Sequence, residues 1–269
     1  MGASGPAGEC CDLLRVPVGY REAVPETEST TPQFRSDVTV ELVRSSAHDS
    51  DVLFAARVST QGEQTLEAAQ DVELDASRSK GLINYLMRDR HGSPFEHNSM
   101  TFYVQAPIFV FREFMRHRIA SYNEESGRYR ELKPVFYVPG PERNLVQVGK
   151  AGAYDFLPGS PEQTELAVSE AKRVATDAYE SYQRMLDAGI AREVARIVLP
   201  LSIYSSMYVT VNARSLMNFV SLRTKREGSH FPSFPQREIE MVAEKMEDLW
   251  EGLMPVTHAA FNENGRVAP

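Results

Sequence analysis

Hydrophobic side chains follow two different periods along this chain, and this mixture is the feature that most restricts its fold. Polar and apolar residues alternate over residues 38–43, 98–105 and 201–211, which is typical of strands with one buried face. Elsewhere, apolar residues recur at intervals of three and four, which places them on one face of a helix. With 269 residues the chain can enclose a sizeable core. The periodicity therefore predicts a mixed α and β body.

Capping and breaking residues locate the helices. The clearest start is Ser160, followed by Pro161 and, two residues later, by Gln163, and this helix should end at Gly189. Pro107 fits the first position of another helix. We also expect helices at about 51–57, 77–88, 192–197, 212–223 with Asn212 as cap, and from Ser233 as cap to Pro255, a short strand at 135–138 and a loop at 139–158.

Composition separates the first residues from the rest. Residues 1–36 are rich in Gly, Pro, Ser, Thr and Glu, which predicts a flexible extension before a single domain at 37–269. The only cysteines, Cys10 and Cys11, are adjacent in this extension, in a pattern that fits neither a disulfide nor a zinc site. The predicted domain therefore has no thiol for nucleophilic addition.

The charge balance limits the classes of partner. A formal net charge of -8 argues against a general nucleic-acid or anionic-membrane binder, because such proteins rely on a broad basic field. We find no signal peptide and no apolar span of about 18 residues, so a cytoplasmic location is the default expectation. An anionic ligand must then be bound by local clusters of donors.

The densest such cluster is RHRIASYNEESGRYR at residues 116–130. Its basic triplet, Arg116 to Arg118, follows an apolar run and should close a helix. Because consecutive helical residues point about 100° apart, the triplet must fan around a large ligand or divide between subunits. An ordinary alternative is that the helix dipole favours cations at this end.

The second half of the cluster is polar and turn-prone. Gly127 allows close approach of the backbone, and the Ser126 hydroxyl and the guanidinium groups of Arg128 and Arg130 could bind phosphate oxygens. Ser-Gly is also ordinary loop composition. Ser126 is not expected to be a nucleophile, because no histidine is placed in the sequence as its obvious base.

The spacing within the cluster favours ligand binding over the two ordinary alternatives. Arg-His-Arg is followed by seven residues and then by Ser. This spacing resembles the signature of the flavin-dependent thymidylate synthases. Further segments are similar to that family in the same order, and the resemblance covers roughly residues 38–253. They are AARVS at 55–59, FEH at 95–97, APIFV at 106–110, REVARIVLP at 192–200 and NARSLMNF at 212–219.

The resemblance implies a fold and a reaction. The fold is α+β, a twisted antiparallel sheet flanked by helices, assembled as a homotetramer with active sites at subunit interfaces. The reaction is methylation of dUMP to dTMP, with methylenetetrahydrofolate as carbon donor, FAD as redox carrier and NADPH as reductant. No cysteine nucleophile takes part, and neither a metal, a nucleic acid nor a membrane is implied as a partner.

The resemblance also implies roles for individual residues. Arg223 is the catalytic residue, which stabilises negative charge on the pyrimidine. Cofactor-binding positions are Ser93, Glu96, Arg116, His117, Arg118, Asn212, Arg214, Asn218 and Leu222. Substrate-binding positions are His91, which faces folate, and Glu113, Arg116, Glu124, Glu125, Ser126, Gly127, Arg128, Arg196 and Arg223.

Two positions depart from the family pattern. Glu113 stands where many relatives carry Gln, and its carboxylate would need protonation or a nearby arginine such as Arg112. The linker at 224–235 is longer than the family pattern, and it is open whether its His230 replaces the family's histidine.

Other readings of these residues remain open at this point. Arg196 could pair with Glu193 or Asp187, and Arg214 and Asn218 could lie on an ordinary surface helix. A non-catalytic nucleotide-binding regulatory protein would keep the phosphate cluster without redox chemistry. A metal-dependent hydrolase could use His91, Glu96 and His97, although their spacing is not that of a zinc-binding helix. The stripe of Arg214, Asn218 and Leu222 favours the enzyme.

Overall fold

A four-stranded antiparallel sheet forms the centre of the fold. The computed structural model describes residues 31–65, 76–150 and 153–269. The strands lie in the order β2 (Thr39–Ser46), β3 (Ser99–Pro107), β8 (Tyr204–Val211) and β4 (Ser121–Glu124). Consecutive strands of the sheet are therefore distant in sequence, and segments far apart in the chain are brought together at its edges.

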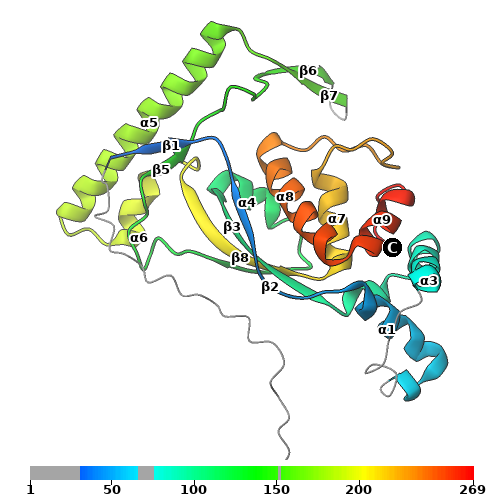
Figure 1. The fold of residues 1–269 in the computed structure, drawn as a ribbon. Coiled ribbons are helices and arrows are strands. Elements are labelled where there is room, and N and C mark those ends of the chain that lie inside the picture. The colour runs from blue at the N-terminus through cyan, green and yellow to red at the C-terminus, as the bar shows by residue number, and fades with distance from the viewer. Residues whose placement is uncertain (1–30, 66–75, 151–152) are drawn as a thin grey trace, which may run out of the picture.

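One face of the sheet is buried under helices. Phe102 on β3 is paired with Val209 on β8, and both are fully buried. Helices α4 (Ile108–Phe114), α7 (Ala213–Arg223) and α8 (Arg237–Leu253) lie on this side (Figure 1). Because side chains alternate along a strand, Tyr103 and Tyr208 project from the other face, where their rings meet edge to face.

Three helices lie together at one end of the sheet (Figure 1). They are α1 (Asp49–Gln61), α3 (Ala76–Arg88) and α9 (Pro255–Glu263). The Asp49 carboxylate accepts hydrogen bonds from the backbone N–H groups of Val256, at 3.0 Å, and Thr257, at 2.8 Å. It thus caps α9, whose N-cap residue Met254 has no side-chain acceptor.

A second, smaller core lies at the other end of the molecule. The long helix α5 (Pro161–Asp187) packs there with the short helices α6 (Arg192–Ala195) and η2 (Arg196–Val198). Strand β1 (Gln33–Arg35) pairs in parallel with β5 (Val135–Tyr137). Strands β6 (Val146–Lys150) and β7 (Ala153–Leu157) form an antiparallel hairpin, and η1 (Ser93–Glu96) leads into β3.

The expected α+β class, with an antiparallel sheet flanked by helices, is confirmed. The Ser160 cap of α5, the Asn212 cap of α7 and the three long alternating strands are confirmed as well. Residues 1–30 lie outside the described residues, so the boundary at residue 36 stays a prediction, and β1 lies just before it.

Several local expectations were wrong. Pro107 ends β3 and is the N-cap of α4, not its first residue, and Ser121 to Glu124 form a strand instead of a turn. Helix α8 starts after Gln236, because Ser233 donates its hydroxyl to the Thr224 carbonyl instead of capping a helix. Pro255 ends α8 but opens α9. The expected loop at 139–158 contains the β6–β7 hairpin. None of the described helices could span a membrane.

We expect Asp49→Ala to lower the free energy of unfolding by about 1.5–3 kcal/mol, because it removes the charged acceptor of the α9 cap. Urea denaturation of the purified protein measures the change. As a control, Asp187→Ala removes an exposed carboxylate at the end of α5 and should cost no more than about 0.5 kcal/mol. Equal stabilities of the two variants would contradict the role of Asp49.

Candidate active site

Helix α7 carries the centre of the candidate site. The Asn212 side chain accepts a hydrogen bond from the backbone N–H of Ser215, at 2.8 Å, and so fixes where the helix begins. One stripe of the helix, with Leu216 and Phe219, is buried in the main core. The stripe of Arg214, Asn218 and Leu222 is not buried, as the four-residue spacing predicts.

The first group of site residues lies at the start of α7, and we call it the helix-start group. Arg214 forms an ion pair with Glu96 of η1 and donates from Nε to the backbone oxygen of Pro269, at 2.6 Å. His91 and Ser93 are exposed on the segment before Glu96, and the His91 ring stacks on Tyr85. The structure therefore brings these predicted positions together.

Asn98 connects η1 to α7 and was missed by sequence reasoning. Its Oδ1 accepts from the backbone N–H of Ala213, at 2.8 Å, and its Nδ2 donates to the Phe95 carbonyl, at 3.1 Å. The only signal for this residue is its place directly after the FEH segment. Asn218, by contrast, is engaged within the helix, because its Nδ2 donates to the Arg214 carbonyl at 3.1 Å.

The second group, the helix-end group, comprises Glu113, His117 and Arg223. Arg223 Nε donates to His117 Nε2 at 3.1 Å, and Arg223 Nη1 lies 3.4 Å from a carboxylate oxygen of Glu113. The arginine that compensates Glu113 is therefore Arg223 and not the exposed Arg112. Only 16% of the Arg223 side chain is accessible, so its guanidinium is held in a fixed position.

His117 is neutral in this arrangement. Burial, and secondly the positive charge of Arg223, lower the pKa of His117 from 6.5 to about 4. A neutral ring also matches the geometry, because Nε2 must be unprotonated to accept the hydrogen bond from Arg223. His117 thus serves as an acceptor that orients Arg223.

The other two members of the basic triplet point away from the core. Helix α4 ends at Phe114, so residues 116–118 follow the helix and do not close it as expected. Arg116 and Arg118 are exposed, whereas His117 between them is half-buried. Neither guanidinium group forms a hydrogen bond or ion pair within the described residues. Both guanidinium groups are therefore available to an anionic ligand.

The third group, which we call the turn group, lies at the end of β4 and is joined by one residue of η2. It comprises Glu124, Glu125, Ser126, Gly127, Arg128 and Arg196. The Ser126 carbonyl accepts from the N–H of Tyr129 at 3.0 Å, which closes a turn. Arg128 is exposed and pairs with Glu193 at 3.2 Å. Arg130 forms an ion pair with Glu125. The turn thus exposes hydroxyl and guanidinium donors side by side.

Arg196 reaches the turn group from η2. A Cβ atom on Gly127 would lie 3.3 Å from the Arg196 Cδ atom, so the glycine makes room for this side chain. The open alternative was an ion pair of Arg196 with Glu193 or Asp187; neither pair forms within the described residues, and Glu193 pairs with Arg128. Burial raises the pKa of Glu124, and the nearby charge of Arg196 partly opposes this change.

The described residues contain no group of three or more histidine, cysteine, aspartate or glutamate side chains that could hold a metal ion. Glu96 is one of the three residues of the hydrolase alternative, and its carboxylate forms an ion pair with Arg214. Within the described chain, no hydrogen bond, ion pair or ring contact joins the turn group to the two groups on α7.

Comparison with known proteins shows the family of this chain. Residues 41–256 match the sequence model of a family described as "Thymidylate synthase complementing protein". The flavin-dependent thymidylate synthase of Streptomyces coelicolor is 68% identical over 238 residues, which cover 88% of this chain and 96% of that protein. The chain belongs to the flavin-dependent thymidylate synthase family. The predicted resemblance is therefore confirmed, and the protein is an enzyme of this family.

Other members are similar over the same length. The flavin-dependent thymidylate synthase of Tropheryma whipplei is 61% identical over 238 residues, 88% of this chain and 98% of that protein. A crystal structure of the UMP/dUMP methylase PolB from Streptomyces cacaoi, bound with 5-Br dUMP, matches with a TM-score of 0.82 and 58% identity. It covers 88% of this chain and 100% of that one. These matches favour the enzyme over the non-catalytic alternative.

We expect NMR titration of the His117 imidazole to give a pKa of about 4. The pKa of 6.5 applies when the chain is unfolded, so the unfolded state binds the proton first as the pH falls. The contribution of His117 to stability is therefore complete above pH 6.5 and is lost toward pH 4. A His117→Gln variant assigns the signal and should show a shallower loss over this range. Titration near 6.5 in the folded protein would refute the assignment.

Proposed function

We propose that this enzyme methylates dUMP to dTMP, with methylenetetrahydrofolate as carbon donor, a bound FAD and NADPH as reductant. The observation that supports this most strongly is Arg223, which is held by a neutral His117 and by Glu113 at the end of α7. The relatives described above are flavin-dependent thymidylate synthases and a UMP/dUMP methylase.

The donors of the helix-start group fit a flavin. The Arg214–Glu96 pair and the exposed stripe of α7 present charged, amide and apolar atoms on one surface. Arg116 and Arg118 are free to bind phosphate groups. A bound, reduced flavin would supply the hydride for the pyrimidine. A thiol cannot activate the pyrimidine by addition here, because the predicted domain has none.

Arg223 is the catalytic residue in this proposal. Its Nε and Nη1 atoms are engaged by His117 and Glu113, whereas Nη2 has no hydrogen-bond partner within the described residues. These free N–H groups can donate to a pyrimidine oxygen on which negative charge develops. Because the guanidinium is already fixed, little reorganisation is needed when that charge forms.

The turn group would hold the phosphate of dUMP. Ser126, the Gly127 backbone and Arg128 offer neutral and charged donors, and Arg196 lies beside them. Glu193 is the counter-ion that a phosphate must displace from Arg128. Glu124, the last residue of β4, and Glu125, which follows it, would contact the sugar or base.

One nucleotide must reach both the turn group and Arg223, yet no hydrogen bond, ion pair or ring contact joins these groups within the described residues. We therefore propose that each site is shared between subunits of a homotetramer. Exposed apolar side chains beside the turn group support such assembly, because they would otherwise face water. They are Tyr129, Val194, Ile197 and Leu201. His91, exposed beside the helix-start group, would face folate.

The test is the visible spectrum and product of the purified protein. With FAD, NADPH, methylenetetrahydrofolate and dUMP, we expect a flavin spectrum that bleaches on reduction and formation of dTMP. Arg223→Ala should retain the flavin but lose turnover by at least about a hundredfold, because it removes the donors to the pyrimidine. UMP is assayed in parallel, since one solved relative is bound with 5-Br UMP. Absence of dTMP despite bound flavin would refute the proposed reaction.

For Arg128→Ala we expect dUMP to bind about ten- to hundredfold more weakly, because one charge-assisted contact to the phosphate is lost. Flavin content should stay nearly unchanged. Isothermal titration with dUMP measures the affinity. Arg173→Ala, which removes an exposed arginine and its ion pairs on α5, is the control and should bind dUMP as the wild type does. Unchanged affinity in Arg128→Ala would remove the residue from the phosphate site.

A further inference from the structure

Residues 265–269, which we call the tail, contact both ends of α7. At the end of the helix, Arg266 Nη2 donates to the Thr224 hydroxyl oxygen at 3.0 Å, and Thr224 directly follows Arg223. At the start of the helix, the backbone oxygen of Pro269 accepts from Arg214 Nε at 2.6 Å. The tail therefore spans the helix that carries the candidate site and contacts it at both ends.

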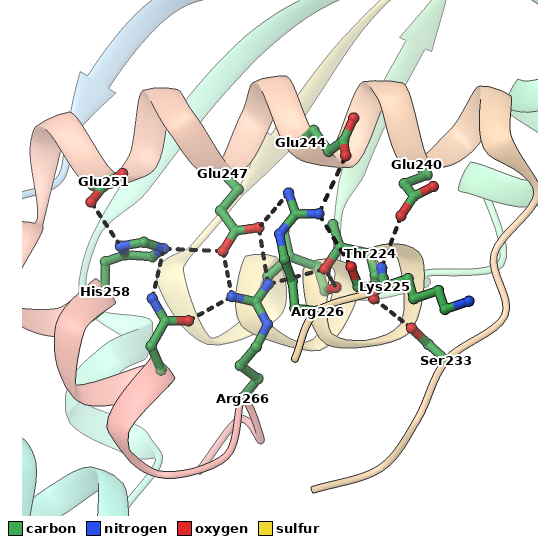
Figure 2. A network of polar contacts seen from close by, with 12 residues as sticks. Thr224, Lys225, Arg226, Ser233, Glu240, Glu244, Glu247, Glu251, His258 and Arg266 are labelled. Carbon is green, nitrogen blue, oxygen red and sulfur yellow. Dashed lines mark hydrogen bonds and ion pairs between the residues drawn. The ribbon is translucent and has the colours of Figure 1, made fainter. Parts of the chain in front are cut away.

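Arg266 is firmly anchored in a buried polar network (Figure 2). Its guanidinium donates to both carboxylate oxygens of Glu247, at 2.7 and 2.9 Å, and to Asn262 at 2.5 Å. Burial alone would raise the pKa of Glu247, but hydrogen bonds from His258 and Arg266 outweigh it and lower the pKa to about 2. Arg266 is thus anchored to α8 by a charged, bidentate contact to Glu247.

Strained backbone marks the same segment. Among the described residues, the non-glycine residues with positive φ are Arg266, at 57°, and Arg90, at 64°. L-residues rarely adopt such a conformation, because the Cβ atom comes too close to the backbone. Arg266 belongs to the tail, and Arg90 Nη1 donates to the Ala268 carbonyl of the tail at 2.8 Å. The strain therefore coincides with the contacts that hold the tail in place.

The tail also fixes the linker that follows Arg223. The N–H of His230 donates to the Gly265 carbonyl at 2.9 Å, and the Ser233 hydroxyl donates to the Thr224 carbonyl. Figure 2 shows Thr224 between Ser233 and Arg266, beside α8. Thr224 is 1% exposed, so its hydroxyl has no water to replace Arg266. The linker at residues 224–235 is therefore held against the tail by hydrogen bonds.

We infer that the tail is a positioning element of the active site, in which Arg266 places Arg223 through Thr224 and Pro269 places Arg214. This inference rests on the proposed function, in which Arg223 binds the pyrimidine and Arg214 binds the flavin. The two contacts lie at opposite ends of α7. They should therefore affect different steps: the Thr224 contact governs turnover, and the Pro269 contact governs flavin affinity.

The first variant, Thr224→Val, keeps the shape of the side chain and removes the acceptor of Arg266. We expect kcat to fall about tenfold, with the dissociation constant of FAD within about twofold of wild type. The pKa of His117 should rise, because Arg223 moves away from it. Thr224→Ser, which keeps the hydroxyl, should behave like the wild type.

The second variant removes Ala268 and Pro269. We expect FAD to bind about tenfold more weakly, as measured by flavin fluorescence, because Arg214 loses a hydrogen-bond acceptor. The pKa of His117 should not change, because the Arg266 contact remains. Asp49→Ala is the control for general loss of stability, since it loosens α9 without touching the tail or α7.

The outcomes distinguish the two proposals. If wild-type protein forms no dTMP, the proposed reaction fails, whereas the FAD titration and the His117 titration still test the tail. If both tail variants match Asp49→Ala in kcat, FAD affinity and His117 titration, the tail only adds stability and the inference is overturned. If Thr224→Val does not fold, unchanged FAD affinity after removal of Ala268 and Pro269 overturns it.

Discussion

The site depends on the stacking of Phe114 on Phe219. Their ring centroids are 4.3 Å apart and nearly parallel, which joins the end of α4 to α7 inside the main core. His117 then packs edge to face on Phe219, and one turn further along α7 Arg223 reaches the histidine. Apolar packing thus sets the position of the charged Arg223 side chain, because a dense core permits few alternative arrangements.

Around this core, the arginines are divided into held and free groups. Arg223 and Arg214 are each fixed by two or more contacts, as electrostatic catalysis and oriented binding require. Arg116 and Arg118 remain exposed and unpaired within the described residues. A net charge of -8 gives no general attraction for anions, so binding must come from these local donors.

The sequence predicted the strands and caps that depend on local chemistry. Ser160 with Gln163, and Asn212 with Ser215, satisfy backbone donors a few residues away, so their positions could be read directly. The cap of α9 could not be found, because Asp49 acts across 207 residues. The hairpin at 146–157 was missed, since its strands are short and mostly exposed. The list of candidate site residues came from the family resemblance. How these residues divide into three groups was seen only in the structure.

The sequence alone determined the class of fold, the family and the types of side chain available, because periodicity, caps and motif spacing are local properties. Only the tertiary structure decided which of these residues meet. It paired Glu113 with Arg223 instead of Arg112, and it brought the tail to both ends of α7. The physical reason is that such contacts depend on how distant segments pack, and local sequence does not encode that packing.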